Sequence, residues 1–83
     1  MIMPTLEAIL EELEQLAEIE AIDPDAPITT IDVDSLDLLE WVCALEDDHG
    51  LSIDEERLAE LAQVEGTTFR AIYEQIVQAQ AAA

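Results

Sequence analysis

The chain has 83 residues, of which 51% are hydrophobic, and 21 acidic side chains against two arginines give it a formal net charge of -19. This length allows one small domain, which we expect to span residues 1–83, and the charge excludes nucleic acid as a partner because its phosphates would be repelled. With one cysteine and no unbroken apolar run, the sequence lacks an internal disulfide and the pattern of a signal peptide or membrane span, so we expect a soluble, cytoplasmic protein.

The first predicted helix spans about residues 4–20. Its apolar residues recur at steps of three and four, which places them on one stripe of a helix; they are Leu6, Ile9, Leu10, Leu13, Leu16 and Ala17. Pro4 suits a first helical turn, whereas Pro24 and Pro27 prevent any continuation. Residues 21–34 are therefore predicted to form a long loop.

Helix-start and helix-stop signals define three further helices. Asp34 followed by Asp37 is an acidic capping pattern, and the second helix is predicted to run from there to about His49, where Gly50 stops it. Ser52 with Glu55 has capping-box spacing, which predicts a short third helix over about 53–62. A fourth helix is predicted from an apolar stripe after Gly66 and Thr67, made of Phe69, Ile72, Tyr73, Ile76 and Val77. The expected fold is an all-α four-helix bundle with a short third helix and a long loop between the first two helices.

The second helix is predicted to have two different faces. At about 100° per residue, one side gathers the core residues Leu38, Trp41, Val42 and Leu45. The other side mixes apolar and acidic residues, and it contains Leu36, Glu40, Cys43 and Asp47, flanked by Leu39 and Asp37. Single exposed leucines are ordinary in small proteins. Because this mixture directly follows a helix-start serine, we interpret it, together with Asp34, as a face on which partner proteins dock.

Ser35 stands where the long loop meets the second helix, within Asp34-Ser35-Leu36-Asp37. The segment from Asp34 to Asp48 resembles the second helix of the acyl carrier proteins, in which an Asp-Ser-Leu motif carries the prosthetic group. Ile53 with the acidic run after it is similar to the entry to the family's third helix, and Thr67-Thr68-Phe69 to the start of its fourth. The resemblance covers nearly the whole chain.

This resemblance implies a carrier that is not an enzyme and has no catalytic residue. It implies that a phosphopantetheinyl transferase moves 4'-phosphopantetheine from coenzyme A onto the Ser35 hydroxyl, and that acyl groups are held as thioesters on the arm. The implied partners are acyltransferases, ketosynthases or adenylating enzymes with basic docking surfaces. A phosphodiester on Ser35 would face the positive end of a helix dipole, while Asp34 and Asp37 are expected to meet cations on the modifying enzyme.

Several positions depart from the family pattern. Asp32 stands where a glycine is common, Ile53 lacks the proline that often follows it, and Trp41 replaces a usual aliphatic residue, which is expected to alter how much of an acyl chain the bundle shelters. The first helix has no lysine or arginine, unlike many fatty-acid carriers. These differences favour a specialised polyketide or mixed peptide-polyketide pathway over fatty acid synthesis.

Other functions fit the sequence less well. A hydrolase would pair Ser35 with His49, the single histidine, but roughly 21 Å of helix separates them. Cys43 has no basic neighbour to lower its thiol pKa and is interpreted as a small packing residue.

The acidic residues of the long loop lack the spacing of a calcium-binding loop, so we expect no metal site; they are Asp23, Asp25, Asp32 and Asp34. An unmodified acidic adaptor or inhibitor of a basic protein remains the alternative; we expect a monomer in either case.

Overall fold

Four α-helices make up the fold, as the sequence predicts. A computed structural model describes residues 3–31 and 33–82, so Asp32 lies outside the described residues. The elements are α1 (Leu6–Ala17), a 3-10 helix η1 (Ile28–Thr30), α2 (Ser35–His49), α3 (Glu55–Gln63) and α4 (Phe69–Ala82). Within the described ranges there is no β-strand beyond a single bridge between Pro27 and Thr68. None of the described helices is long and apolar enough to cross a membrane.

Helix α1 is shorter than predicted because its caps lie inside the expected range. The Thr5 hydroxyl oxygen accepts a hydrogen bond from the Ala8 N–H at 3.1 Å, so Pro4 lies before the helix and not in its first turn. The helix ends where Glu18 adopts a left-handed backbone with φ of 56°. Its buried residues belong to the predicted stripe, and they are Leu6, Ile9, Leu10 and Leu13.

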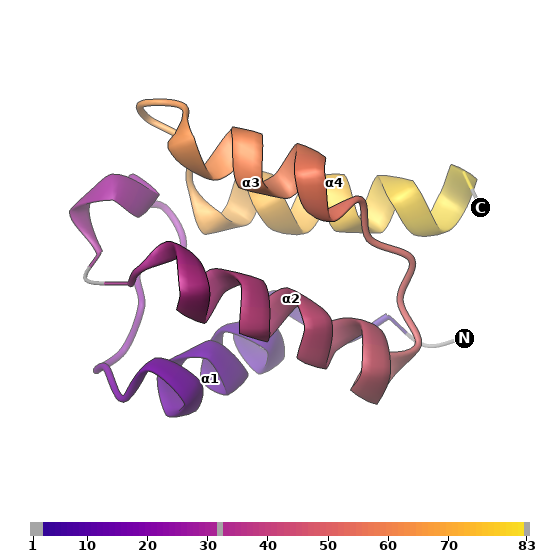
Figure 1. Ribbon diagram of the computed structural model, residues 1–83, viewed down its shortest axis with the longest axis horizontal. Coiled ribbons are helices and arrows are strands. Elements are labelled where there is room, and N and C mark those ends of the chain that lie inside the picture. Colours follow the sequence, from indigo (N-terminus) through magenta and orange to yellow (C-terminus); the bar gives the residue numbers. More distant parts are fainter. Residues whose placement is uncertain (1–2, 32, 83) are drawn as a thin grey trace.

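Helix α2 has the predicted bounds and crosses the centre of the fold, between α1 and α3 (Figure 1). The Asp34 carboxylate accepts the Asp37 N–H at 2.8 Å, and Gly50, with φ of 65°, ends the helix. Trp41, Val42 and Leu45 are buried on the predicted core face, whereas Leu38 is only half-buried. Residues at the start of α2 are therefore held by a local cap and by the core farther along the helix.

The start of α3 differs from the prediction. Asp54, not Ser52, caps the helix by accepting the Arg57 N–H at 3.1 Å, and the helix runs over 55–63 instead of 53–62. The backbone of Ser52 binds α4 instead, because its N–H donates to the Gln80 amide oxygen at 2.9 Å and its carbonyl accepts the Gln80 amide N–H at 2.7 Å. The α2–α3 connection is thus tied to α4 before the third helix begins.

The long loop after α1 is anchored to the start of α4. The Ile28 N–H donates to the Thr67 carbonyl at 2.7 Å, and the Arg70 N–H donates to the Pro24 carbonyl at 3.0 Å. The Arg70 guanidinium also binds the Asp25 carboxylate at 2.7 Å, and this hydrogen bond lowers the pKa of Asp25. Burial of Ile28 in η1 completes the attachment. The loop therefore has a defined shape where it leads into α2.

Candidate functional site

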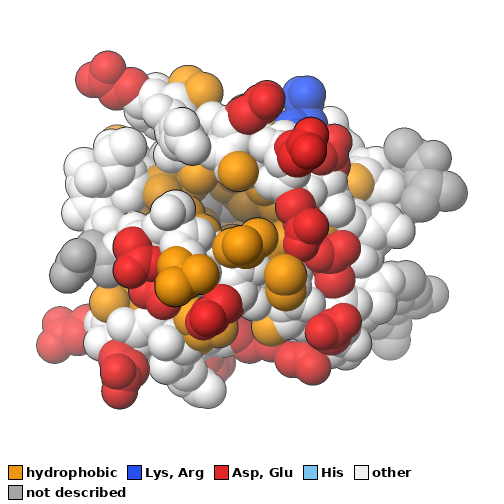
Figure 2. Space-filling model, in the orientation of Figure 1, with side chains coloured by type: hydrophobic (Ala, Val, Ile, Leu, Met, Phe, Trp, Pro, Cys, Tyr) orange, Lys and Arg blue, Asp and Glu red, His pale blue; other side chains and the backbone are white. Residues whose placement is uncertain are grey.

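Ser35 is the first residue of α2, and its side chain is exposed. It lies on the edge of a pocket of about 270 Å³ formed by α2, α3, η1 and the start of α4. In Figure 2, hydrophobic side chains gather around a hollow near the middle of this face, with acidic side chains surrounding them. The predicted attachment residue thus stands at the opening of an apolar cavity.

The pocket has a buried inner wall and an exposed rim. The inner wall is entirely apolar and consists of Ile28, Trp41, Val42, Leu58, Phe69 and Ile72. The rim carries the exposed lining residues, which are Thr29, Ser35, Leu39, Glu55, Ala59 and Gln63. Four further half-buried apolar residues, Ile31, Val33, Leu38 and Ala62, lie between them. An apolar group that passed the rim beside Ser35 would therefore leave water and meet hydrocarbon and aromatic surface at the inner wall.

The position of Ser35 suits a covalently bound phosphate. The first turn of α2 has backbone N–H groups without partners inside the helix, and the positive end of the helix dipole lies there. Asp34 uses its carboxylate to cap the helix, which occupies one of these N–H groups. An exposed hydroxyl, a helix N-terminus and an adjoining apolar pocket together fit an arm that begins with a phosphodiester and ends in a thiol.

Most residues of the predicted docking face are exposed, and one of them, Leu39, also lies on the rim of the pocket. Leu36 is 62% exposed and Leu39 is 50% exposed, the highest values among the large hydrophobic residues of α2. Glu40, Cys43 and Asp47 are exposed along the same helix, as is Asp34 before it, whereas Asp37 is half-buried. Ser35 and six of the seven predicted docking residues are thus exposed along α2 or directly before it.

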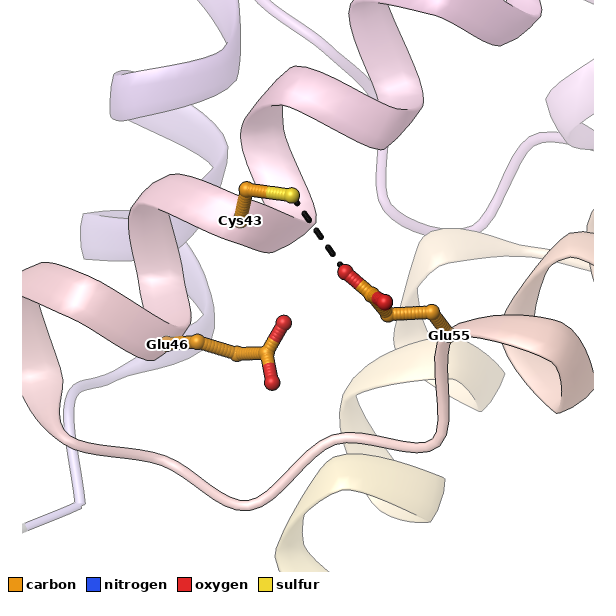
Figure 3. A group of neighbouring side chains, drawn as sticks. All are labelled: Cys43, Glu46 and Glu55. Atoms are coloured by element: carbon orange, nitrogen blue, oxygen red, sulfur yellow. Dashed lines mark hydrogen bonds between the residues drawn. The ribbon is translucent and has the colours of Figure 1, made fainter.

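Cys43 is an exposed residue, so its interpretation as a packing residue is wrong. Its thiol donates a hydrogen bond to the Glu55 carboxylate, with 3.3 Å between Sγ and Oε1, and Glu46 lies beside them (Figure 3). This hydrogen bond, followed by desolvation and the nearby negative charges, raises the pKa of Cys43. The thiol thus stays protonated at neutral pH and links α2 to the start of α3, a long-range contact that helix periodicity does not reveal.

The surroundings of Glu46 disfavour the charged form of its side chain. Its pKa is raised, first by desolvation, then by a hydrogen bond with Glu55 and by the charges of Glu55 and Asp47. Because the folded-state pKa is the higher one, protonation of Glu46 stabilises the fold; this contribution is complete below the ordinary glutamate pKa of about 4.3 and is lost as the pH rises through the folded value.

Replacement of Glu46 by glutamine is accordingly expected to raise the melting temperature at pH 7 by a few degrees, the effect of about 0.5 kcal/mol in a domain of this size. The advantage should disappear below about pH 4, where wild-type Glu46 is itself protonated. Glu11→Gln, an exposed site on α1, is the control for the loss of one negative charge. The melting temperatures of both variants are measured at pH 7 and below about pH 4. Equal increases at pH 7 would show that the Glu46 carboxylate destabilises the fold no more than any other negative charge.

The residues that a hydrolase or a calcium site would use make structural contacts instead. His49 ends α2, whereas Ser35 begins it, and the His49 Nε2 contacts the Glu12 carboxylate at 2.8 Å, which joins α2 to α1. Asp25 is paired with Arg70, and Asp23 accepts the Asp25 N–H at 2.9 Å. These contacts place His49 away from Ser35 and give the loop carboxylates structural partners.

Comparison with known proteins gives one positive result. Neither the curated proteins nor the solved structures contain a match to the chain. The family model described as the phosphopantetheine attachment site matches residues 4–68, from just before α1 to the residue before α4. Domains of this family are non-catalytic carriers with 4'-phosphopantetheine covalently attached to a serine, and they interact with phosphopantetheinyl transferases and biosynthetic enzymes. The chain belongs to the phosphopantetheine attachment family and is a carrier protein of the acyl carrier type.

Proposed function

We propose that Ser35 carries the phosphopantetheine arm and that the chain presents acyl intermediates to biosynthetic enzymes as thioesters on that arm. The observation that carries this proposal is the exposed Ser35 hydroxyl at the rim of the apolar pocket. The chain has one other serine, Ser52, which lies between α2 and α3 and does not line this pocket. Of the two serines, only Ser35 combines exposure, a helix N-terminus and a neighbouring cavity.

The parts of the site then have separate tasks. The first turn of α2 stabilises the phosphodiester through its free N–H groups and dipole. The arm supplies a thiol on which acyl groups form thioesters, and the apolar inner wall excludes water from a cargo that enters the pocket. The chain needs no acid, base or nucleophile of its own for this work, because bond formation on the cargo belongs to the partner enzymes.

The docking face recognises those partners. Leu36 and Leu39 supply apolar contacts, while Asp34, Asp37, Glu40 and Asp47 attract basic surfaces and Cys43 adds a small neutral contact between them. A net charge of -19 increases the rate at which cationic surfaces meet this face. The proposed partners are a phosphopantetheinyl transferase and acyltransferases, ketosynthases or adenylating enzymes that have basic docking surfaces.

The pathway that we propose is the synthesis of a polyketide or a mixed peptide-polyketide, with fatty acid synthesis as the alternative. Two features support this choice. Helix α1 has no lysine or arginine, and Trp41 occupies the inner wall of the pocket. The carrier is proposed to act in the cytoplasm as a monomeric single domain.

Intact-mass measurement tests the proposed function. The purified chain is incubated with an acyl coenzyme A and a broad-specificity transferase, and the product is then treated with neutral hydroxylamine, which cleaves thioesters. We expect one addition with the mass of the acylated arm, followed by loss of the acyl group and retention of the arm. A competent transferase that adds no mass would instead support the unmodified adaptor.

A further inference from the structure

We propose that Gln80, near the end of α4, is a positioning residue for the docking face: its side-chain amide holds the start of α3 in place and thereby keeps Glu55 against Cys43. This inference rests on the proposed function, because the docking face is part of that proposal. It adds a residue that belongs neither to the docking face nor to the pocket beside Ser35, yet controls how partner enzymes meet the chain.

The Gln80 amide makes three hydrogen bonds. Its oxygen accepts the Ser52 N–H at 2.9 Å, and its nitrogen donates to the Ser52 carbonyl at 2.7 Å and to the Ile76 carbonyl of its own helix at 2.9 Å. The amide oxygen and both amide hydrogens are thus engaged. Because two of these bonds hold the N–H and the carbonyl of one residue, they fix the backbone of the α2–α3 connection three residues before Glu55 begins α3.

Helix α3 has little buried surface to hold it. Among its residues, all of which the structure describes, only Leu58 is buried. Leu58 lines the pocket beside Ser35 and also a second cavity, of about 300 Å³, between α3 and α4, which lie alongside each other in Figure 1. A further link to α4, from the Arg57 Nε to the Gln75 amide oxygen, is exposed and measures 3.4 Å. The position of α3 therefore depends strongly on how its first residues are held.

The first residue of α3 contacts the docking face. The Cys43 thiol donates to the Glu55 carboxylate, with 3.3 Å between Sγ and Oε1 (Figure 3). This hydrogen bond is the largest cause of the raised pKa of Cys43. If the start of α3 moved, Glu55 would leave Cys43, and the shape and charge of the surface between α2 and α3 would change. Gln80 thus acts on Cys43 through the Ser52 backbone and Glu55.

The rate at which iodoacetamide alkylates Cys43, the single cysteine, reports whether Glu55 stays in place. The thiolate is the reactive form, so loss of the Glu55 contact lowers the thiol pKa and speeds alkylation. Gln80→Met keeps the length of the side chain without its amide, and we expect it to raise the rate at pH 8 about threefold. Gln78→Met is the matched control, because Gln78 is exposed on α4 and does not bind Ser52; its rate should stay within about 1.5-fold of wild type.

A double-mutant cycle tests whether Gln80 acts through Glu55. In a Glu55→Gln background the carboxylate is already absent, so Gln80→Met should change the alkylation rate by less than about 1.5-fold.

Hydrogen exchange separates release of α3 from general loosening of the fold. In Gln80→Met we expect the amides from Ala59 to Gln63 to exchange about tenfold faster, as for an opening that becomes easier by about 1.4 kcal/mol. The amides of α1 should change by less than about twofold, because α1 does not depend on the Gln80 contacts.

Transferase kinetics, with the chain as the varied substrate, measure the effect on a partner. Gln80→Met should raise the KM of a broad-specificity phosphopantetheinyl transferase about threefold, because a smaller fraction of the molecules presents the surface that the enzyme binds. The kcat should stay at the wild-type value, since Ser35 and the Asp34 cap are unchanged.

The outcomes separate this inference from the proposed function. A wild-type chain that accepts no arm overturns the proposed function and the docking role of Gln80 with it, while alkylation and exchange still decide whether Gln80 holds α3. An unchanged alkylation rate, an equal acceleration in the Glu55→Gln background, or equally faster exchange in α1 overturns the hold of Gln80 on α3. An unchanged KM in a variant with faster alkylation overturns its action on partners.

Discussion

Replacement of Ser35 by alanine is expected to abolish phosphopantetheinylation while leaving the fold intact. The hydroxyl oxygen is the atom that would receive the arm, and alanine has no group to replace it. Ser35 is exposed at the first position of α2, where alanine is a good helix former, so the free energy of unfolding should change by less than about 0.5 kcal/mol. Intact mass and thermal unfolding of the same sample measure the two effects.

Ser52→Ala is the matched control for this substitution, since Ser52 is the other serine and is also exposed. The hydrogen bonds that join Ser52 to Gln80 use its backbone N–H and carbonyl, which alanine retains. This variant should be loaded at the wild-type rate. Normal loading of Ser35→Ala, or loss of loading in Ser52→Ala, would contradict the assignment.

Truncation of Leu36 to alanine is expected to produce the second large effect, a loss of partner recognition. Leu36 is 62% exposed beside Ser35, so it contributes little to the core but lies where a partner must approach the hydroxyl. If it is a central apolar anchor of the interface, its removal costs about 2 kcal/mol, or roughly 30-fold in the kcat/KM of the phosphopantetheinyl transferase. Steady-state kinetics with the chain as the varied substrate measure this value.

Val64→Ala is the control, because Val64 is similarly apolar and 54% exposed but lies at the end of α3, off the predicted docking face. Its kcat/KM should stay within about twofold of the wild-type value, as expected for a contact outside the interface. Equal losses in the two variants would indicate a general need for surface hydrophobicity. No loss in Leu36→Ala would remove this residue from the docking face.

Local sequence rules predicted the bounds of α2 and most of its buried and exposed positions, because the determinants lie within a few residues of one another; Leu38 and Asp37, both half-buried, are the exceptions. Asp34 caps the helix through the Asp37 N–H three residues later, and Gly50 takes the left-handed conformation that ends it. The burial of Trp41 and the exposure of Leu36 follow from helical periodicity alone. The position of Ser35 at the helix start was therefore predictable.

The errors occur where competing or distant contacts decide the structure. Ser52 and Asp54 both suit a helix cap. The Ser52 backbone is hydrogen-bonded to Gln80 in α4, and Asp54 caps α3. Helix periodicity placed Cys43 on the exposed face, but the lack of a basic neighbour led to its interpretation as a packing residue, and neither shows that Glu55 of the next helix accepts its hydrogen bond. In each case the partner is at least 12 residues away or on another element.

The pocket was beyond prediction for the same reason. Its walls come from α2, α3, η1 and the start of α4, and η1 itself depends on the attachment of Ile28 to Thr67. The sequence indicated that Trp41 faces the core, but not that its indole binds Ile9 and bounds a cavity beside Ser35. The sequence thus predicted which face of α2 Trp41 occupies, but it did not predict the cavity that lies between the helices.

Fragment-ion mass spectrometry of the loaded wild-type chain locates the arm directly. We expect fragments that contain Ser35 to carry the phosphopantetheine mass and fragments that contain only Ser52 to lack it. An arm found on Ser52, or a chain that stays unmodified with a transferase shown to be active on another carrier, would contradict the assignment of Ser35.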